Sequence, residues 1–115
     1  MEVWKESIRL VPEVYALISN FPPEEKYGLS SQVSRSAVSI PSNIAEGCGR
    51  SSEKEFARFL EISLGSAYEL ETQIWVAIAL KFLTKVQGQE VIDKVVNNQK
   101  RISALIRTVR TAMDN

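Results

Sequence analysis

Residues 34–50 read SRSAVSIPSNIAEGCGR, and this stretch decides how the rest of the chain is arranged. Read at helical spacing, one side of the stretch carries the apolar residues Val33, Ala37, Ile40 and Ile44. A second side repeats with the same spacing but is polar, and it carries Arg35, Ser39, Ser42, Glu46 and Arg50. One side of this segment can therefore be buried while the other forms hydrogen bonds.

Pro41 interrupts the segment, and glycines close it. Because proline lacks an amide donor and clashes with the preceding turn, we expect Pro41 to bend or split the helix. Ser39 and Ser42 are expected to bond the carbonyl groups that the proline leaves free. The helix is expected to end at Gly47 or Gly49 through the backbone geometry that glycine permits.

The first helix is expected to run from Trp4 to about Asn20, because apolar residues step by three and four in two parallel rows. Pro12 lies inside it, so we expect a kink there or loosely formed first two turns. The following proline pair ends this helix and places Pro23 in the first turn of the second helix, where Glu24 complements the helix dipole.

Ser52 and Glu55 have the spacing of a capping box, so the third and longest helix is expected to start at Ser52 or one residue earlier. Gly65 lies in its middle among small residues, a pattern that favours close approach of another helix. A break at Thr84–Gly88 precedes the fourth helix. The sequence thus predicts one all-α domain over residues 1–115, an antiparallel up-down-up-down four-helix bundle with its second helix kinked near Pro41.

Composition limits what the chain can do. Its 14 basic and 14 acidic residues cancel, so any binding to nucleic acid or a membrane must be local. The absence of histidine removes the commonest general base and metal ligand, and we expect no metal, cofactor or catalytic residue. A single cysteine, Cys48, fits a reducing compartment. The apolar run Ile74–Leu80 is far shorter than the ~20 residues that cross a bilayer, and we expect a cytoplasmic protein.

Three features in or near residues 34–50 could form a binding or catalytic site, but none of them contains a complete known motif. The glycines and serine of residues 47–52 imitate a dinucleotide fingerprint, yet they follow a helix rather than a strand. Cations in residues 50–58 lie near the start of the third helix, where backbone donors could hold an anion, or where they simply face solvent. Ser39 or Ser42 could act as a nucleophile, but neither has a glycine-flanked elbow.

The fourth predicted helix carries a run of cations that is the candidate nucleic-acid surface. These residues are Lys94, Lys100, Arg101, Arg107 and Arg110. The helix has no recognised reading motif and no aromatic residues between the cations, so a solvated face is the alternative. The first and third helices each carry two apolar rows, more than one four-helix core needs. We therefore expect a homo-oligomer.

Two longer runs carry a family resemblance, FPPEEKYGL at residues 21–29 and SIPSNIAEG at residues 39–47. Further matching positions are Ser31, Gln32, Arg35, Arg50, Phe59, Leu60, Gly65, Ser66, Glu69, Leu70, Glu71 and Gln73. Together they resemble the four-helix-bundle family of 23S rRNA intervening-sequence proteins over nearly the whole chain. The motif S-I-P-x-N-I-A-E-G is the most specific part of this resemblance.

The resemblance implies a compact bundle that assembles into a pentameric ring and has no established enzymatic activity. It also implies a relation to the accessory variability-determinant proteins of diversity-generating retroelements, which bind reverse transcriptase and nucleic acid. Those relatives are usually basic, whereas this chain is neutral. The positions that we carry over as a structural or interaction stripe are Arg35, Ser39, Asn43, Glu46 and Arg50.

Two functions follow from these observations. One is a non-catalytic oligomeric scaffold or adaptor that associates with RNA, DNA or a nucleic-acid enzyme such as a reverse transcriptase. The other is a nucleotide- or phosphate-handling enzyme that uses the site between Ser34 and Arg50. The missing histidine, metal ligands and nucleophile geometry favour the scaffold.

Overall fold

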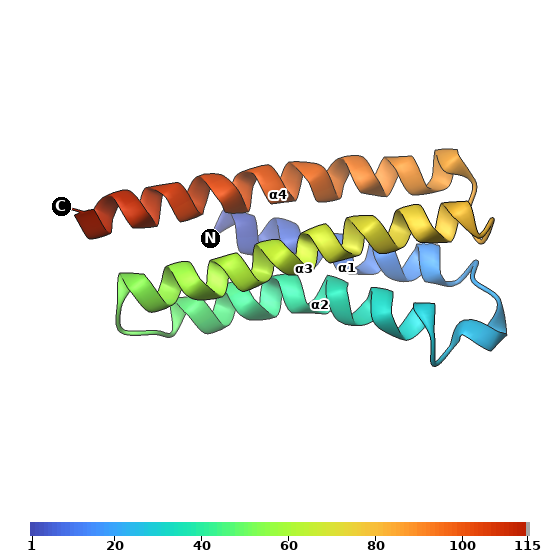
Figure 1. The fold of residues 1–115 in the computed structure, drawn as a ribbon, viewed down its shortest axis with the longest axis horizontal. Helices are drawn as coiled ribbons and strands as arrows, with labels where there is room; N and C mark the ends of the chain where they lie inside the picture. Colours follow the sequence, from blue (N-terminus) through green and yellow to red (C-terminus); the bar gives the residue numbers. More distant parts are fainter. Residues whose placement is uncertain (115) are drawn as a thin grey trace.

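The computed structural model describes residues 1–114, which form an all-helical bundle (Figure 1). The elements are α1 (Glu2–Ile18), the short 3-10 helix η1 (Pro23–Glu25), α2 (Leu29–Cys48), α3 (Glu53–Ala79) and α4 (Lys85–Asp114). No strand occurs within these residues. The prediction of an all-α four-helix bundle is confirmed. None of the helices in the described part of the chain is long and apolar enough to cross a membrane.

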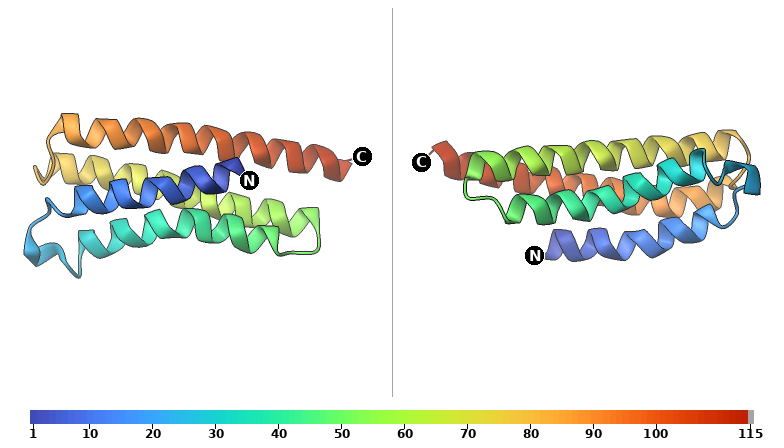
Figure 2. Two further views of the ribbon diagram at one scale, coloured as in Figure 1. Left: turned by 180° about the vertical axis from the view of Figure 1, so that it is seen from behind. Right: turned by 90° about the horizontal axis from the view of Figure 1, so that it is seen from below.

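The bundle is a rod with extents of 50 × 24 × 19 Å, and consecutive helices run in opposite directions along it (Figure 1). α2 packs against α1 and α3, and α4 packs against α1 and α3. The diagonal pairs, α1 with α3 and α2 with α4, are not neighbours within residues 1–114. The α1/α2 side and the α3/α4 side are therefore opposite faces of the rod (Figure 2).

Every helix buries one apolar side in a single core, as expected for amphipathic helices. The largest fully buried apolar side chains are Val14, Val33, Ile40, Ile44, Leu60, Leu70, Ile74, Val95 and Ile102. The apolar side predicted for the second helix is thus the buried one, since Val33, Ala37, Ile40 and Ile44 are all buried.

The second helix begins later than the sequence predicts. Pro23–Glu25 form only one 3-10 turn, and α2 starts at Leu29. Gly28 adopts φ −109° and ψ −116°, which interrupts the helix, and the Glu25 Oε1 atom accepts a hydrogen bond of 3.0 Å from the Leu29 amide. The first amides of a helix have no hydrogen-bond partner inside the helix. The Glu25 carboxylate therefore takes the role that the N-cap side chain usually has, because Gly28 at the N-cap position has no side chain.

Both α1 and α2 are continuous helices across their internal prolines, Pro12 and Pro41. The expected splitting at Pro41 and the loosely formed first two turns of α1 are therefore wrong, while a bend at either proline stays a prediction. At its far end α2 stops at Cys48, and Gly49 has right-handed geometry with φ −82°. The predicted end point is confirmed, but glycine's special backbone freedom is not used there.

The serines around Pro41 do not rescue the carbonyl that the proline frees. In a helix that carbonyl belongs to the residue four positions earlier, Ala37. Ser42 instead donates to the Val38 carbonyl at 2.8 Å, and the Ser39 hydroxyl pairs with a side chain of α3. This part of the sequence-based interpretation is wrong, because Ser39 points toward the neighbouring helix.

The cap of α3 is as predicted, since the Ser52 hydroxyl accepts a hydrogen bond of 3.1 Å from the Glu55 amide. The close approach expected at Gly65 is wrong, because a Cβ atom there would meet nothing within 4 Å. Close approach occurs instead at Gly88, which lies inside α4 against Ile78 of α3. The break before α4 also lies earlier in the chain than Thr84–Gly88, because α4 already starts at Lys85.

Candidate functional site

The polar side of α2 faces α3 through a line of small hydroxyl groups, which we call the serine seam. Ser36 donates to Glu69 at 2.7 Å, and the hydroxyls of Ser39 and Ser66 lie 2.9 Å apart. The buried Ser63 donates to a backbone carbonyl of α2 at 2.8 Å. Small side chains allow the two helices to approach closely, and each hydroxyl finds a partner across the contact.

Asn43 belongs to the same seam, because its Nδ2 atom donates to both the carbonyl and the hydroxyl of Ser39 at 2.9 Å. The Ser39 hydroxyl is thus held by Ser66 and Asn43, and Ser42 is bonded to its own helix. Neither serine is aligned with a general base. In the described residues no three histidine, cysteine or acidic side chains gather as a metal site.

Glu46 and Arg50 form a separate pair at the end of α2. The Arg50 Nη2 atom lies 2.5 Å from Glu46 Oε1, and both side chains are about half exposed. The Arg50 guanidinium also lies over the Phe59 ring of α3, 4.8 Å from its centroid, and Arg58 approaches the same ring at 5.6 Å. An exposed ion pair adds only about 0–1 kcal/mol to stability, and an exposed cation–π contact adds a similar amount, so neither contact dominates this site.

Arg35 is exposed and borders a shallow hollow together with Tyr15 of α1 and with Ser34, Val38, Ser39 and Ser42 of α2. The five residues of the predicted stripe therefore occupy three places: Ser39 and Asn43 in the serine seam, Glu46 and Arg50 at the end of α2, and Arg35 facing α1.

Three of the five predicted cations of α4 are paired with carboxylates. The pairs are Lys94 with Glu13, Arg101 with Glu6, and Arg110 with Glu61. The hydrogen bond with Glu13 raises the pKa of Lys94 above its usual value. Lys100 and Arg107 make no ion pair within residues 1–114. Of the five predicted cations, these two are left for an outside partner of α4.

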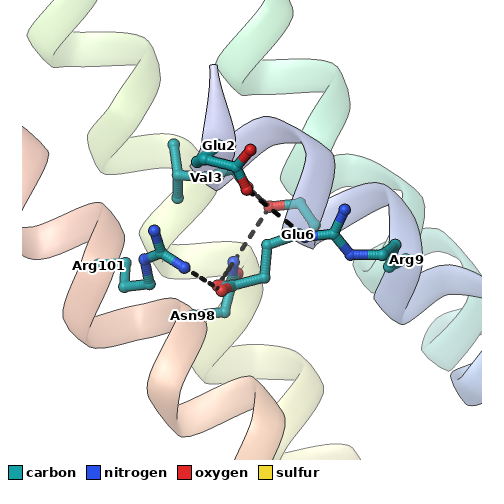
Figure 3. A network of polar contacts seen from close by, with 7 residues as sticks. Glu2, Val3, Glu6, Arg9, Asn98 and Arg101 are labelled. Carbon is teal, nitrogen blue, oxygen red and sulfur yellow. Dashed lines mark hydrogen bonds and ion pairs between the residues drawn. The ribbon is translucent and has the colours of Figure 1, made fainter.

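A buried polar cluster joins α1 to α4 (Figure 3). Asn98 is 0% exposed, and its Nδ2 atom donates to Glu6 Oε1 at 3.0 Å and to Ser7 Oγ at 3.1 Å. Arg101 donates to the other oxygen of Glu6 at 2.5 Å. The Asn98 Oδ1 atom is buried and has no partner in the described chain. Sequence reasoning did not single out Asn98, because one polar residue within an apolar seam does not reveal its partner.

An apolar groove runs between α1 and α2 on the outside of the bundle, and we call it the α1/α2 groove. It has a volume of about 470 Å³ and is bordered by Trp4, Ile8, Val11, Pro12, Val38, Pro41, Ser42 and Ala45. Trp4, Ile8 and Val38 remain 37%, 43% and 42% exposed. Large apolar side chains left in water on one face are typical of a surface that another molecule covers.

The sequence was compared with known families, and it matches the family described as 23S rRNA-intervening sequence protein over residues 1–104. The chain belongs to this family. It is also similar to the crystal structure of a protein of unknown function from the S23 ribosomal protein family of Bacteroides thetaiotaomicron, with 26% identity and a TM-score of 0.83. That likeness covers 90% of this chain and 97% of the other. No curated protein matches the chain.

The motif through which the sequence resembles the 23S rRNA-intervening sequence proteins now has a structural account. Within residues 39–47, Ser39 and Asn43 enter the serine seam, and Ile40 and Ile44 enter the core. The buried Gly47 lies in tight contact with α3, as an added Cβ atom would be 2.9 Å from the Phe56 ring. The partners on α3 were not predicted as part of the stripe, although their small size at helical spacing indicated a close helix contact.

Proposed function

We propose that this 23S rRNA-intervening sequence protein is a non-catalytic, self-associating scaffold or adaptor that works with RNA, DNA or a nucleic-acid enzyme such as a reverse transcriptase. The observation that carries the proposal is the α1/α2 groove. The groove is apolar, lies outside the core and is bordered by side chains that water would otherwise surround. A second copy of the chain is the occupant that we propose.

The chain supplies a surface that suits this groove. Apolar side chains outside the core also remain on α3 and directly after it, since Ile62 and Val76 are each 41% exposed and Leu80 is 53% exposed. α3 lies diagonally across the bundle from α1, so one copy cannot use these side chains to cover its own groove. Contact between two different surfaces is head-to-tail, and such contacts close into rings when the rotation permits.

Charge does not oppose this association, because the formal net charge of each copy is zero. The family resemblance adds the pentamer as the expected ring. The enzyme alternative has no comparable support, since the Ser39 hydroxyl pairs with Ser66 of α3 and the exposed Ser42 hydroxyl donates to a carbonyl of its own helix. The contact between α2 and α3 is sufficient to explain why the Ser39 hydroxyl is present.

Light scattering after size-exclusion chromatography tests the proposal. We expect a species of about five times the 12.9 kDa mass of one chain. Val38→Glu places a charge in the groove and is expected to reduce the mass to that of a monomer, because burying an unpaired carboxylate is strongly unfavourable. Val86→Glu is the matched control, since Val86 is 81% exposed on α4 and lies outside the groove.

A wild-type chain that is strictly monomeric would refute self-association. An oligomer whose mass is unchanged by Val38→Glu would show that a different surface joins the copies. The partner is tested separately by the gene's surroundings, because a position inside a ribosomal RNA insertion or beside a reverse transcriptase favours different nucleic-acid partners.

A further inference from the structure

A second hollow lies on the opposite face of the bundle, between α3 and α4, and we call it the α3/α4 pocket. It has a volume of about 320 Å³. Its border consists of Tyr68 from α3 and of Val96, Gln99, Lys100, Ser103 and Arg107 from α4. It shares no residue with the α1/α2 groove, so the two surfaces can be occupied at the same time.

The pocket holds Lys100 and Arg107, two cations of α4 that have no carboxylate partner within the described residues. Lys100 and Arg107 are seven residues apart on one side of the helix, which places them about 10 Å apart along its axis. Ser103 lies between them, and Arg107 makes only a long hydrogen bond of 3.4 Å to its hydroxyl. The positive charge of the pocket is therefore not neutralised by the bundle.

An aromatic ring faces these cations from the neighbouring helix. Tyr68 is 52% exposed, so part of its side chain is open to a ligand. The pocket wall beside it is fixed, because the buried Gln99 donates to the Ala67 carbonyl at 3.2 Å and to Glu71 at 2.8 Å. The sequence of α4 alone contains no aromatic residue between its cations, and the fold supplies one from α3.

We propose that the α3/α4 pocket binds a short segment of single-stranded nucleic acid, with a base stacked on Tyr68 and neighbouring phosphates on Lys100 and Arg107. An aromatic ring beside unpaired cations is the combination that single-strand binding uses, because every base has a face that can stack. An acidic peptide could meet the cations but has no base for Tyr68. The proposal deepens the nucleic-acid association proposed above and does not depend on self-association.

Fluorescence anisotropy with a labelled oligouridylate in low salt tests the pocket. Tyr68→Leu removes the ring but keeps an apolar side chain, and we expect affinity to fall about tenfold. Tyr68→Phe keeps the ring and is expected to bind as the wild type does. Replacing both Lys100 and Arg107 with alanine should weaken binding. It should also make the negative slope of log affinity against log salt less steep by about 1.4, as expected for two lost phosphate contacts.

The matched control is the double variant Arg101→Ala and Arg110→Ala, which removes two charges from the same helix that are already paired with carboxylates. We expect its affinity to stay near that of the wild type. Thermal melting and light-scattering mass are measured for every variant, so that loss of folding or of assembly is recognised as such.

Several results would overturn the proposal. Tyr68→Leu binding the oligouridylate as tightly as the wild type would exclude base stacking. A blunt RNA duplex binding as well as the single strand would do the same, because duplex bases are not available to the ring. A labelled polyglutamate with equal affinity and equal sensitivity to the Lys100 and Arg107 change would identify the pocket as a site for acidic protein segments. A loss of RNA binding that always accompanies a fall in the light-scattering mass would also overturn it, because binding would then depend on assembly and not on the pocket.

Discussion

Glycine has opposite roles at two positions of this bundle. Gly47 lies at the contact of α2 and α3, where an added Cβ atom would be 2.9 Å from a ring carbon of Phe56 and 3.0 Å from Cβ of Phe59. Gly65 lies in the middle of α3 and faces open space. The same substitution therefore meets a packed contact at one position and solvent at the other.

We expect Gly47→Ala to destabilise the protein and Gly65→Ala to stabilise it. Alanine is favoured over glycine inside a helix by about 1 kcal/mol, and overpacking a tight contact loses about 1–3 kcal/mol. At Gly47 the overpacking is the larger effect, whereas at Gly65 only the gain in helix propensity remains. Urea denaturation should show midpoints that move in opposite directions. A stabilised Gly47→Ala variant would mean that the Phe56 and Phe59 side chains move aside at little cost.

For single residues, the sequence predicts an interaction only when the two partners lie close together in the chain. The cap by Ser52 was predictable because both partners lie within one helical turn. The role of Gly65 was not, since the small residues around it indicated a close helix contact but not which of them face the neighbouring helix: Ser63 and Ser66 do, and Gly65 does not. The partners of Ser39 and Ser36 on α3 lie 27 and 33 residues away, and only the fold brings them together.

Between elements, the contact of α1 with α4 depends on a few buried polar groups. Asn98 is enclosed there and donates to the Glu6 carboxylate, and Arg101 holds the opposite oxygen of Glu6. One carboxylate thus receives hydrogen bonds from two residues of α4. A polar group at one position of an apolar seam disfavours other registers of the two helices, because a shifted helix would bury it without a partner.

Asn98→Asp tests this contact. The change removes both donors and places a second carboxylate beside Glu6, so we expect a loss of about 3 kcal/mol or more at neutral pH. The neighbouring carboxylate and burial raise the pKa of the new side chain in the folded state above its value in the unfolded chain. The folded protein therefore binds a proton more tightly, and the loss should shrink as pH falls through that raised pKa.

The matched control for this experiment is Asn97→Asp, which introduces the same charge on the exposed side of α4. Chemical denaturation at several pH values compares the two variants. Equal, pH-independent effects for both would show that the Asn98 contact contributes no specificity to the pairing of α1 with α4.

Helix boundaries show where sequence patterns stop being informative. Periodicity predicted all four helices, because each one buries a continuous apolar side. It misplaced the start of α2, where a side chain of Glu25 and the backbone of Gly28 decide the boundary. It also could not pair the cations of α4, since Arg101 finds Glu6 at a separation of 95 residues.

Across the whole molecule, the bundle presents two different opposite faces. The α1/α2 face is apolar, and the α3/α4 face combines an aromatic ring with unpaired cations. The sequence indicated surplus apolar rows and a basic helix, but not that the corresponding surfaces face away from each other. That separation follows from the order in which the helices pack, and it allows a chain with no net charge to carry one local basic site.

The position of Cys48 allows its labelling rate to report whether the α1/α2 groove is covered. It is the only cysteine, it is exposed, and it borders a hollow with Met1, Trp4 and Ala45, the last two of which also border the α1/α2 groove. A thiol-specific dye therefore needs no engineered attachment point. We expect labelling to be slow in concentrated wild-type protein and to accelerate on dilution or in the Val38→Glu variant. A labelling rate that is independent of protein concentration would mean that small reagents reach this end of the groove even when the copies are associated.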